Sequence, residues 1–247
     1  MAQGADIERE ARAASMIIAR RAETSDYVID RRRWYHAHPE IAYHEVATTE
    51  QICADLEALG IPYERPTATG VVATIRGTTQ SAYGAADSPR RRIMLRADID
   101  GLPVVERTGE PFSSENDGFM HACGHDCHIA MLLGAARLLA GMTDELEGEV
   151  RLVFQPAEEG GNGSKTMISA GVLEGVDGVF GMHIWSDVPA GKVSVEAGPR
   201  MAATDWWRID VTGRSAHGAM PNQGADAVLA GAAIVESLQA IVSRNMS

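Results

Sequence analysis

Long apolar runs are absent from this sequence, and cysteine is scarce. A membrane-spanning helix needs roughly 20 apolar residues in succession, and no run approaches that length. The N-terminal segment is rich in Glu and Arg and lacks the uninterrupted apolar stretch of a signal peptide. The 3 cysteines are an odd number, and Cys123 and Cys127 lack the CxxC spacing of redox pairs, so disulfides are not expected. We therefore predict a cytoplasmic protein that does not engage a membrane.

Positive charge is also in deficit. The chain has 22 Lys and Arg against 34 Asp and Glu, a formal net charge of -12. A surface of this sign repels nucleic acid and favours solubility. We therefore expect a small-molecule partner and no nucleic acid. At 247 residues the chain can bury a substantial core, in one large domain or two smaller ones.

Helix and strand patterns alternate along most of the chain, which predicts an α/β fold with a mainly parallel sheet flanked by helices. Ligands of such sheets gather at the carboxyl ends of the strands. The predicted helices run to about residue 33, over 45–59, from the cap residue Asp126 to about residue 142, and over 164–172. The predicted strands cover 71–75, 93–95, 150–154 and 179–183.

The pattern starts again after Gly198 and Pro199. A strand is predicted over 206–211 and a helix over 225–244. One strand and one helix cannot close a core, so this unit needs more chain or a partner to cover it. We expect a truncated chain with one domain over 1–199 and the start of a smaller α+β domain over 200–247. The apolar face of the last helix carries Val228, Ala232, Val235, Leu238 and Val242.

Potential metal ligands are concentrated in residues 119–128, which contain three histidines, two cysteines and an aspartate. In an extended segment Cys123 and His125 point to the same side, so a thiolate and an imidazole can reach one ion. An acidic pair, Glu158 and Glu159, and a lone histidine, His183, follow at the ends of later predicted strands. Thiolate, imidazole and carboxylate donors suit Zn²⁺ and other first-row transition ions, whereas an oxygen-only set indicates Mg²⁺ or Ca²⁺.

Six motifs in a fixed order resemble the M20 peptidase superfamily of metal-dependent aminoacylases and amidohydrolases, especially its hippurate and auxin-conjugate hydrolase branch. Each motif alone is weak or moderate, but six ordered matches make chance an implausible explanation. The resemblance runs from about Tyr27 to the last residue. The motifs are Arg33-Trp-Tyr-His36-Ala-His38-Pro39-Glu40, Leu95-Arg-Ala-Asp98-Ile-Asp100-Gly-Leu-Pro103, His121-Ala-Cys123-Gly-His125-Asp126, Glu158-Glu159, Gly181-Met-His183 and Gly213-Arg-Ser-Ala-His217-Gly-Ala-Met-Pro221.

The resemblance implies a pair of divalent transition-metal ions, Zn, Mn, Ni or Co, in a zinc-exopeptidase-like catalytic domain over 1–199. It implies that Glu158 is the general base and that His217 stabilises the oxyanion, commonly from the partner subunit of a homodimer. The segment over 200–247 then begins the lid or dimerisation domain. Neighbouring residues of an extended strand point in different directions, which allows Glu158 and Glu159 separate roles. The implied metal ligands are Cys123, His125, Glu159 and His183.

Other motif residues receive less specific expectations. Asp98 and Asp100 are expected to orient ligands or shape loops rather than to bind metal directly. Cys127 and His128, on the helix after Asp126, are interpreted as packing residues. No chemical role follows from the sequence for the remaining signature residues, which are His36, His38 and Glu40.

The implied reaction is hydrolysis of the amide bond of an N-acyl amino acid or a related small conjugate. Alternatives are a metallo-exopeptidase acting on short peptides, and an inactive truncated homologue that acts only by association. A weaker alternative is a thiol enzyme with Cys123 as nucleophile and His125 as base. Complete family members supply a further histidine ligand near their C-terminus, so this chain, ending at Ser247, is expected to turn over slowly on its own.

Overall fold

The computed structural model describes residues 2–79, 91–201 and 207–245. The chain divides into two compact units, Met1–Lys192 and Val193–Ser247, and each is considered by itself. The helices of the first unit are α1 (Ala2–Ala37), α2 (Val46–Ala58), α3 (His125–Ala140) and α4 (Gly163–Ser169). Its strands are β1 (Tyr63–Glu64), β2 (Val71–Arg76), β3 (Arg92–Asp98), β4 (Glu149–Gln155) and β5 (Gly178–Gly181).

These elements form one five-stranded mixed sheet in the order β1-β2-β4-β3-β5. The α/β class is confirmed. Strands β3, β4 and β5 are parallel, because helices α3 and α4 provide the crossovers that parallel neighbours need. Strands β1 and β2 are antiparallel to each other, as their short connection without a helix allows, and β2 is also antiparallel to its other neighbour, β4. The expectation of a mainly parallel sheet therefore holds for the half that carries the site.

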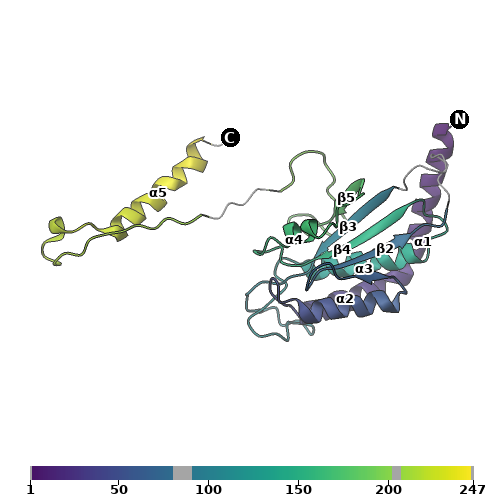
Figure 1. The fold of residues 1–247 in the computed structure, drawn as a ribbon, viewed down its shortest axis with the longest axis horizontal. Coiled ribbons are helices and arrows are strands. Elements are labelled where there is room, and N and C mark those ends of the chain that lie inside the picture. Colours follow the sequence, from purple (N-terminus) through teal and green to yellow (C-terminus); the bar gives the residue numbers. More distant parts are fainter. Residues whose placement is uncertain (1, 80–90, 202–206, 246–247) are drawn as a thin grey trace. The chain divides into compact units, whose positions relative to one another are not determined.

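Three helices cover one face of the sheet and one covers the other (Figure 1). Helices α1, α2 and α3 bury the larger cluster, which includes Leu56 and Leu133, against β2 and β4. Helix α4 contributes Met167 to a smaller cluster with Val72 and Val153 on the opposite face. Successive strand residues thus alternate between two cores, as the pleat requires.

The register of the parallel strands brings the candidate residues to one edge. Asp98, the last residue of β3, pairs with Gln155, the last residue of β4, and Arg96 pairs with Gly181 at the end of β5. The predicted site residues follow these strand ends in the sequence, as is typical of sheets with parallel strands. Strand β5 ends at Gly181, two residues before His183, so the predicted strand over 179–183 extends too far.

The start of α3 differs from the prediction. Asp126 was expected to cap this helix, but the helix begins at His125 after Gly124, and no side chain caps it. Gly124 has a φ of 84°, a left-handed conformation that favours glycine. The Asp126 carboxylate instead accepts one hydrogen bond from the His36 Nδ1 at 2.7 Å and lies 3.0 Å from the Arg32 Nε. It ties α3 to α1 rather than satisfying the helix terminus.

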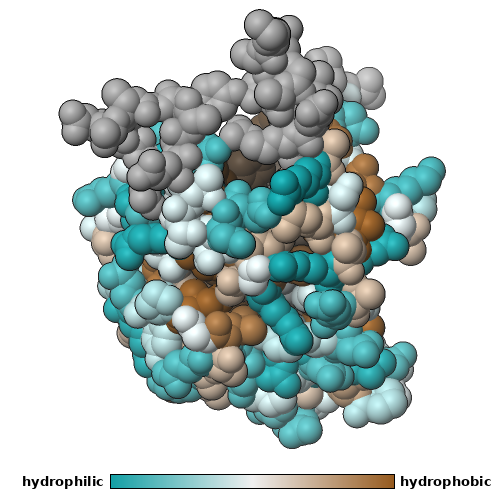
Figure 2. All heavy atoms as spheres, turned by 90° about the vertical axis from the view of Figure 1, so that its right-hand side faces the viewer, coloured by the Kyte–Doolittle hydropathy of each residue, from teal (hydrophilic) through white to brown (hydrophobic). Residues whose placement is uncertain are grey.

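The surface agrees with the composition. The face shown in Figure 2 is mostly hydrophilic, and its apolar area is divided into separate parts. Among the helices of the described residues, none is long and apolar enough to cross a membrane.

The second unit contains a 3-10 turn, η1 (Pro221–Gln223), and a helix, α5 (Ala227–Asn245). The predicted strand over 206–211 is wrong for residues 207–211, and Trp206 lies outside the described residues. A strand needs a neighbour for its backbone N–H and C=O groups, and the described part of this unit supplies only the bridge between Arg214 and Ala225. On α5, Val228 and Val235 are 83% and 61% exposed, so the expected apolar face is uncovered within the unit.

Candidate metal centre

Five predicted site residues come together around His125. One potential ligand atom each from Cys123, His125 and His183 lie within 4.8 Å of one another, and a second such group joins His125 to Glu158 and Glu159. The Cys123 Sγ is 3.4 Å from the His183 Nε2. The sequence predicts that Cys123 and His125 share one side of an extended segment. In the structure, the left-handed Gly124 and the first turn of α3 position these two side chains instead.

Two buried atoms in this cluster have no hydrogen-bond partner among the described residues: the His125 Nε2 and the Glu159 Oε1. They lie 3.8 Å apart. Leaving such atoms unpaired in the interior costs roughly 1–3 kcal/mol each, so buried polar atoms in native proteins nearly always have a partner. A divalent cation held by these residues would supply that partner for both atoms, and the donor types suit a transition metal. The residues therefore fit a bound metal.

Asp100 holds both of these ligand candidates in place. Its backbone carbonyl accepts a hydrogen bond from the His125 Nδ1 at 2.8 Å, which leaves the Nε2 lone pair directed at the cluster. Its carboxylate accepts from the Glu159 backbone N–H at 3.0 Å. Burial opposes the charged imidazole, but the carboxylates of Asp100 and Asp98 outweigh it and raise the pKa of His125 above its ordinary value. A cation at Nε2 therefore competes with a proton.

The two glutamates differ in exposure rather than in distance from His125. The Glu158 side chain is 43% exposed and the Glu159 side chain 23% exposed, whereas their nearest oxygens lie 3.9 Å and 3.8 Å from the His125 Nε2. Burial raises the pKa of Glu158 above its ordinary value. Glu158 and Glu159 lie in a turn beyond β4 rather than at the end of an extended strand. The conformation of this turn, and not the pleat of a strand, therefore determines where their side chains point.

The acidic turn has a strained backbone. Ala157 and Asn162 are non-glycine residues with positive φ values of 52° and 56°. The left-handed conformation costs roughly 1–2 kcal/mol for a residue with a Cβ. The turn is closed by a hydrogen bond from the Gly163 N–H to the Ala157 carbonyl at 3.0 Å. A Cβ at Gly163 collides with the Pro156 carbonyl oxygen, so only glycine fits there.

His128 has a structural role that its interpretation as a packing residue missed. Its Nδ1 is 2.6 Å from the Asp98 Oδ1, and its Nε2 accepts a hydrogen bond from the Ile184 N–H at 3.1 Å. These two hydrogen bonds connect the end of β3 to Ile184, the residue after His183. Burial opposes ionisation of Asp98, but the His128 hydrogen bond and the His125 and Arg96 charges hold its pKa well below the ordinary value. The available sequence signal is the spacing of three residues from His125, which places both histidines on one helix face.

The Cys123 thiol is a poor nucleophile in this environment. Burial and the neighbouring Glu159 and Glu158 carboxylates raise its pKa to about 12. Catalytic thiols need the opposite, a lowered pKa from a nearby positive charge. A bound cation would provide that charge and would stabilise the thiolate form of Cys123. The arrangement favours the metal interpretation over the thiol-enzyme alternative.

Two signature residues without a predicted role gain one from the fold. The Glu40 carboxylate accepts from the Ala47 N–H at 3.1 Å and the Thr48 N–H at 2.8 Å, which caps the start of α2. His36 lies between Asp126 and Glu106, at 2.7 Å and 3.2 Å. The role of both residues is to connect helices and loops around the site.

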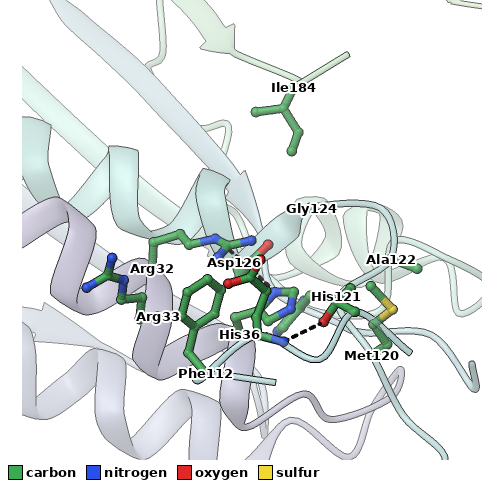
Figure 3. Close-up of a pocket in the computed structure, with 12 residues that line it drawn as sticks. Arg32, Arg33, His36, Phe112, Met120, His121, Ala122, Gly124, Asp126 and Ile184 are labelled. Carbon is green, nitrogen blue, oxygen red and sulfur yellow. Dashed lines mark hydrogen bonds and ion pairs between the residues drawn. The ribbon is translucent and has the colours of Figure 1, made fainter. Parts of the chain in front are cut away.

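A cavity of about 480 Å³ lies next to the cluster, between α1, the loop before α3 and Ile184 (Figure 3). Gly124 and Ile184, neighbours of Cys123 and His183 in the chain, form part of its wall. His121 is buried in the wall, and both of its ring nitrogens lack a partner among the described residues. Burial lowers the pKa of His121 to about 4, so its imidazole is neutral.

His217 belongs to the second unit. Its side chain is exposed, and its Nδ1 accepts a hydrogen bond from the Ala219 N–H at 3.2 Å. Within that unit the described residues place no acidic or cysteine ligand in a cluster with it. Its expected action on the oxyanion stays a prediction.

The fold and the site define an α/β protein with a transition-metal donor set. The model of peptidase family M20/M25/M40 matches residues 94–245. The chain is 43% identical over 224 residues to an N-acyl-L-amino acid amidohydrolase of Geobacillus stearothermophilus, covering 90% of this chain and 58% of that protein. It is 41% identical to an IAA-amino acid hydrolase of Arabidopsis thaliana, covering 93% and 50%.

A solved structure agrees. The YXEP protein of Bacillus subtilis, described as a dinuclear metal binding peptidase from the M20 family, superposes with a TM-score of 0.66 at 43% sequence identity. The match covers 72% of this chain and 48% of that one. The chain therefore belongs to peptidase family M20/M25/M40, as the ordered motifs indicate. It spans about half the length of the relatives it matches.

Proposed function

We propose that this protein is a metal-dependent amidohydrolase that cleaves the amide bond of N-acyl amino acids or related small conjugates. The observation that carries the proposal is a pair of buried atoms without a hydrogen-bond partner among the described residues. These atoms, the His125 Nε2 and the Glu159 Oε1, lie 3.8 Å apart, and Cys123 and His183 form a further group of potential ligands with His125. Relatives named as an amidohydrolase and a conjugate hydrolase at 43% and 41% identity support the substrate class.

We further propose two divalent transition-metal ions, because the similar Bacillus subtilis structure is described as dinuclear. Cys123, His125, Glu159 and His183 would hold them, with Zn, Mn, Ni and Co as the candidates. Bound metal would polarise the substrate carbonyl and make water a better nucleophile.

Glu158 is the proposed proton carrier. Its Oε2 lies 3.9 Å from the His125 Nε2, at the cluster yet exposed, so it can reach both water and substrate. Its raised pKa brings the carboxyl closer to the working pH, which suits a group that takes a proton from water and returns it to the leaving amine. His217 is the proposed oxyanion donor, supplied by the partner subunit of a homodimer formed through a lid domain over 200–247, with the catalytic domain over 1–199.

The test is release of free amino acid from a panel of N-acyl amino acids, auxin conjugates and dipeptides, before and after metal removal with a chelator. The expected result is hydrolysis of N-acyl substrates that a chelator abolishes and a divalent transition metal restores. Cleavage confined to dipeptides would favour a metallo-exopeptidase, the alternative that the peptidase description of the Bacillus subtilis structure supports. Metal-loaded protein that cleaves none of these amides would contradict the proposal.

We also propose a cytoplasmic location. Its support is that Cys53, Cys123 and Cys127 are all free thiols in the structure, as expected in a reducing compartment. Cell fractionation tests the compartment, and the molar mass in solution tests the homodimer.

A further inference from the structure

Glu45 is a fully buried carboxylate in the loop between α1 and α2. One carboxylate oxygen accepts a hydrogen bond from the Ala157 backbone N–H at 2.8 Å, although 112 residues separate the two in sequence. Its other oxygen has no hydrogen-bond partner among the described residues. Burying a carboxylate is costly unless its hydrogen bonds compensate, so a residue of this kind calls for a specific explanation.

The N–H that Glu45 accepts from belongs to the strained residue at the start of the acidic turn. Ala157 is left-handed, and Glu158 and Glu159 follow it directly. Rotation of the peptide plane at Ala157 swings both carboxylates, because each Cα–Cβ direction follows the backbone. A hydrogen bond from a buried acceptor to this N–H therefore fixes where the two glutamates point.

The same loop holds the turn at a second place. Tyr43, itself at a φ of 62°, donates from its hydroxyl to the Gly161 carbonyl. A Cβ at Gly161 collides with the Tyr43 ring, so ring and turn are in close contact. Residues 43 and 45 thus hold the turn on both sides of the acidic pair, while Asp100, two residues beyond the end of β3, accepts from the Glu159 N–H.

Capping of α2 does not explain the Glu45 side chain. Glu45 stands at the N-cap position, but its side chain makes no cap hydrogen bond. The first free N–H groups of α2, at Ala47 and Thr48, are taken by the Glu40 carboxylate. The Glu45 carboxylate is therefore directed away from its own helix and toward the acidic turn.

We propose that Glu45 is a positioning residue: it orients Glu158 and Glu159 through the Ala157 N–H. The inference rests on the proposed function in one respect, namely that Glu159 binds a metal ion and Glu158 transfers a proton. Removal of a residue that orients a metal ligand typically lowers metal affinity or activity by about 10–100-fold.

The experiment compares Glu45→Ala, Glu45→Gln and Glu40→Ala in the full chain. Glu45→Gln keeps an acceptor oxygen for Ala157, whereas Glu45→Ala removes it. Glu40→Ala is the matched control, because it removes a carboxylate of the same loop that binds α2 and not the turn. Four quantities are measured: the affinity of the metal-free protein for Co²⁺ by visible absorption, kcat, KM and the midpoint of thermal unfolding.

Glu45→Ala should weaken Co²⁺ binding by about 10–100-fold and lower kcat with KM changed by less than about threefold. Glu45→Gln should restore both to within about threefold of the parent, and Glu40→Ala should lower only the melting midpoint. Equal loss of Co²⁺ affinity in Glu40→Ala and Glu45→Ala would overturn the proposal, since it indicates general destabilisation. So would unchanged Co²⁺ affinity and kcat in Glu45→Ala. A parent protein inactive on every amide would refute the proposed function instead, and the Co²⁺ titration would still decide the role of Glu45.

Discussion

Replacement of Glu158 and Glu159 by glutamine, one at a time, tests the proton-transfer role proposed for Glu158 and the metal-binding role proposed for Glu159. Distance does not assign the roles, since the nearest oxygens of Glu158 and Glu159 lie 3.9 Å and 3.8 Å from the His125 Nε2. Exposure distinguishes the two residues and supports the roles we propose, because the Glu159 Oε1 is enclosed without a hydrogen-bond partner among the described residues, whereas the Glu158 side chain is 43% exposed. We expect Glu159→Gln to lose bound metal, since a neutral amide is a weaker ligand than a carboxylate.

Glu158→Gln should retain metal and lose turnover. General acid–base catalysis contributes typically 10²–10⁴-fold, so kcat should fall by about that factor, or about 3–5 kcal/mol in barrier height. Two measurements are made on each variant: the metal content per chain by inductively coupled plasma mass spectrometry, and the initial rate of hydrolysis of an N-acyl amino acid. Unchanged melting midpoints serve as the control for folding. Metal loss in Glu158→Gln with metal retained in Glu159→Gln would refute the assignment from burial.

Three further predictions concern the surroundings of the site. His128→Ala should weaken metal binding by about 10–100-fold, measured by titration, because it removes the acceptor that holds Ile184, the residue after the proposed ligand His183. Unchanged affinity would leave His128 with a packing role alone. Gly163→Ala should lower the free energy of unfolding in urea by roughly 1–3 kcal/mol, because the added Cβ collides with the Pro156 carbonyl oxygen. The control is Gly160→Ala, where the Cβ enters open space and should change the free energy of unfolding by less than about 0.5 kcal/mol. The hydrogen bond to Asp126 raises the pKa of His36 in the folded protein above its ordinary value of 6.5. The contribution of protonated His36 to the free energy of unfolding is therefore fully present below pH 6.5 and is lost as the pH rises through the folded-state pKa. His36→Gln should therefore flatten the urea-derived stability between pH 6 and 9, and a profile parallel to that of the parent would count against the pair.

Local patterns in the sequence predicted most of the sheet and helices, because apolar periodicity and turn residues act over a few neighbours. The helix predicted over 45–59 is α2, Val46–Ala58, and the strand predicted over 150–154 is β4, Glu149–Gln155. The predicted strand over 206–211, which is wrong for residues 207–211, shows the limit of this information. Its residues have a β pattern, but a strand exists only where a neighbour accepts and donates its backbone hydrogen bonds.

The candidate site also has features that the sequence predicts and features that only the tertiary structure determines. The sequence by itself determined the donor types, their order and their positions beyond three strands, and parallel strands bring such positions to one edge. Only the tertiary structure decided that Gly124 and Ala157 turn the chain with positive φ values and that His128 connects Asp98 to the chain beyond β5. It also decided that Glu45 supports a turn 112 residues away. These features arise from contacts between segments distant in sequence, and no local pattern encodes which buried acceptor will meet which backbone N–H.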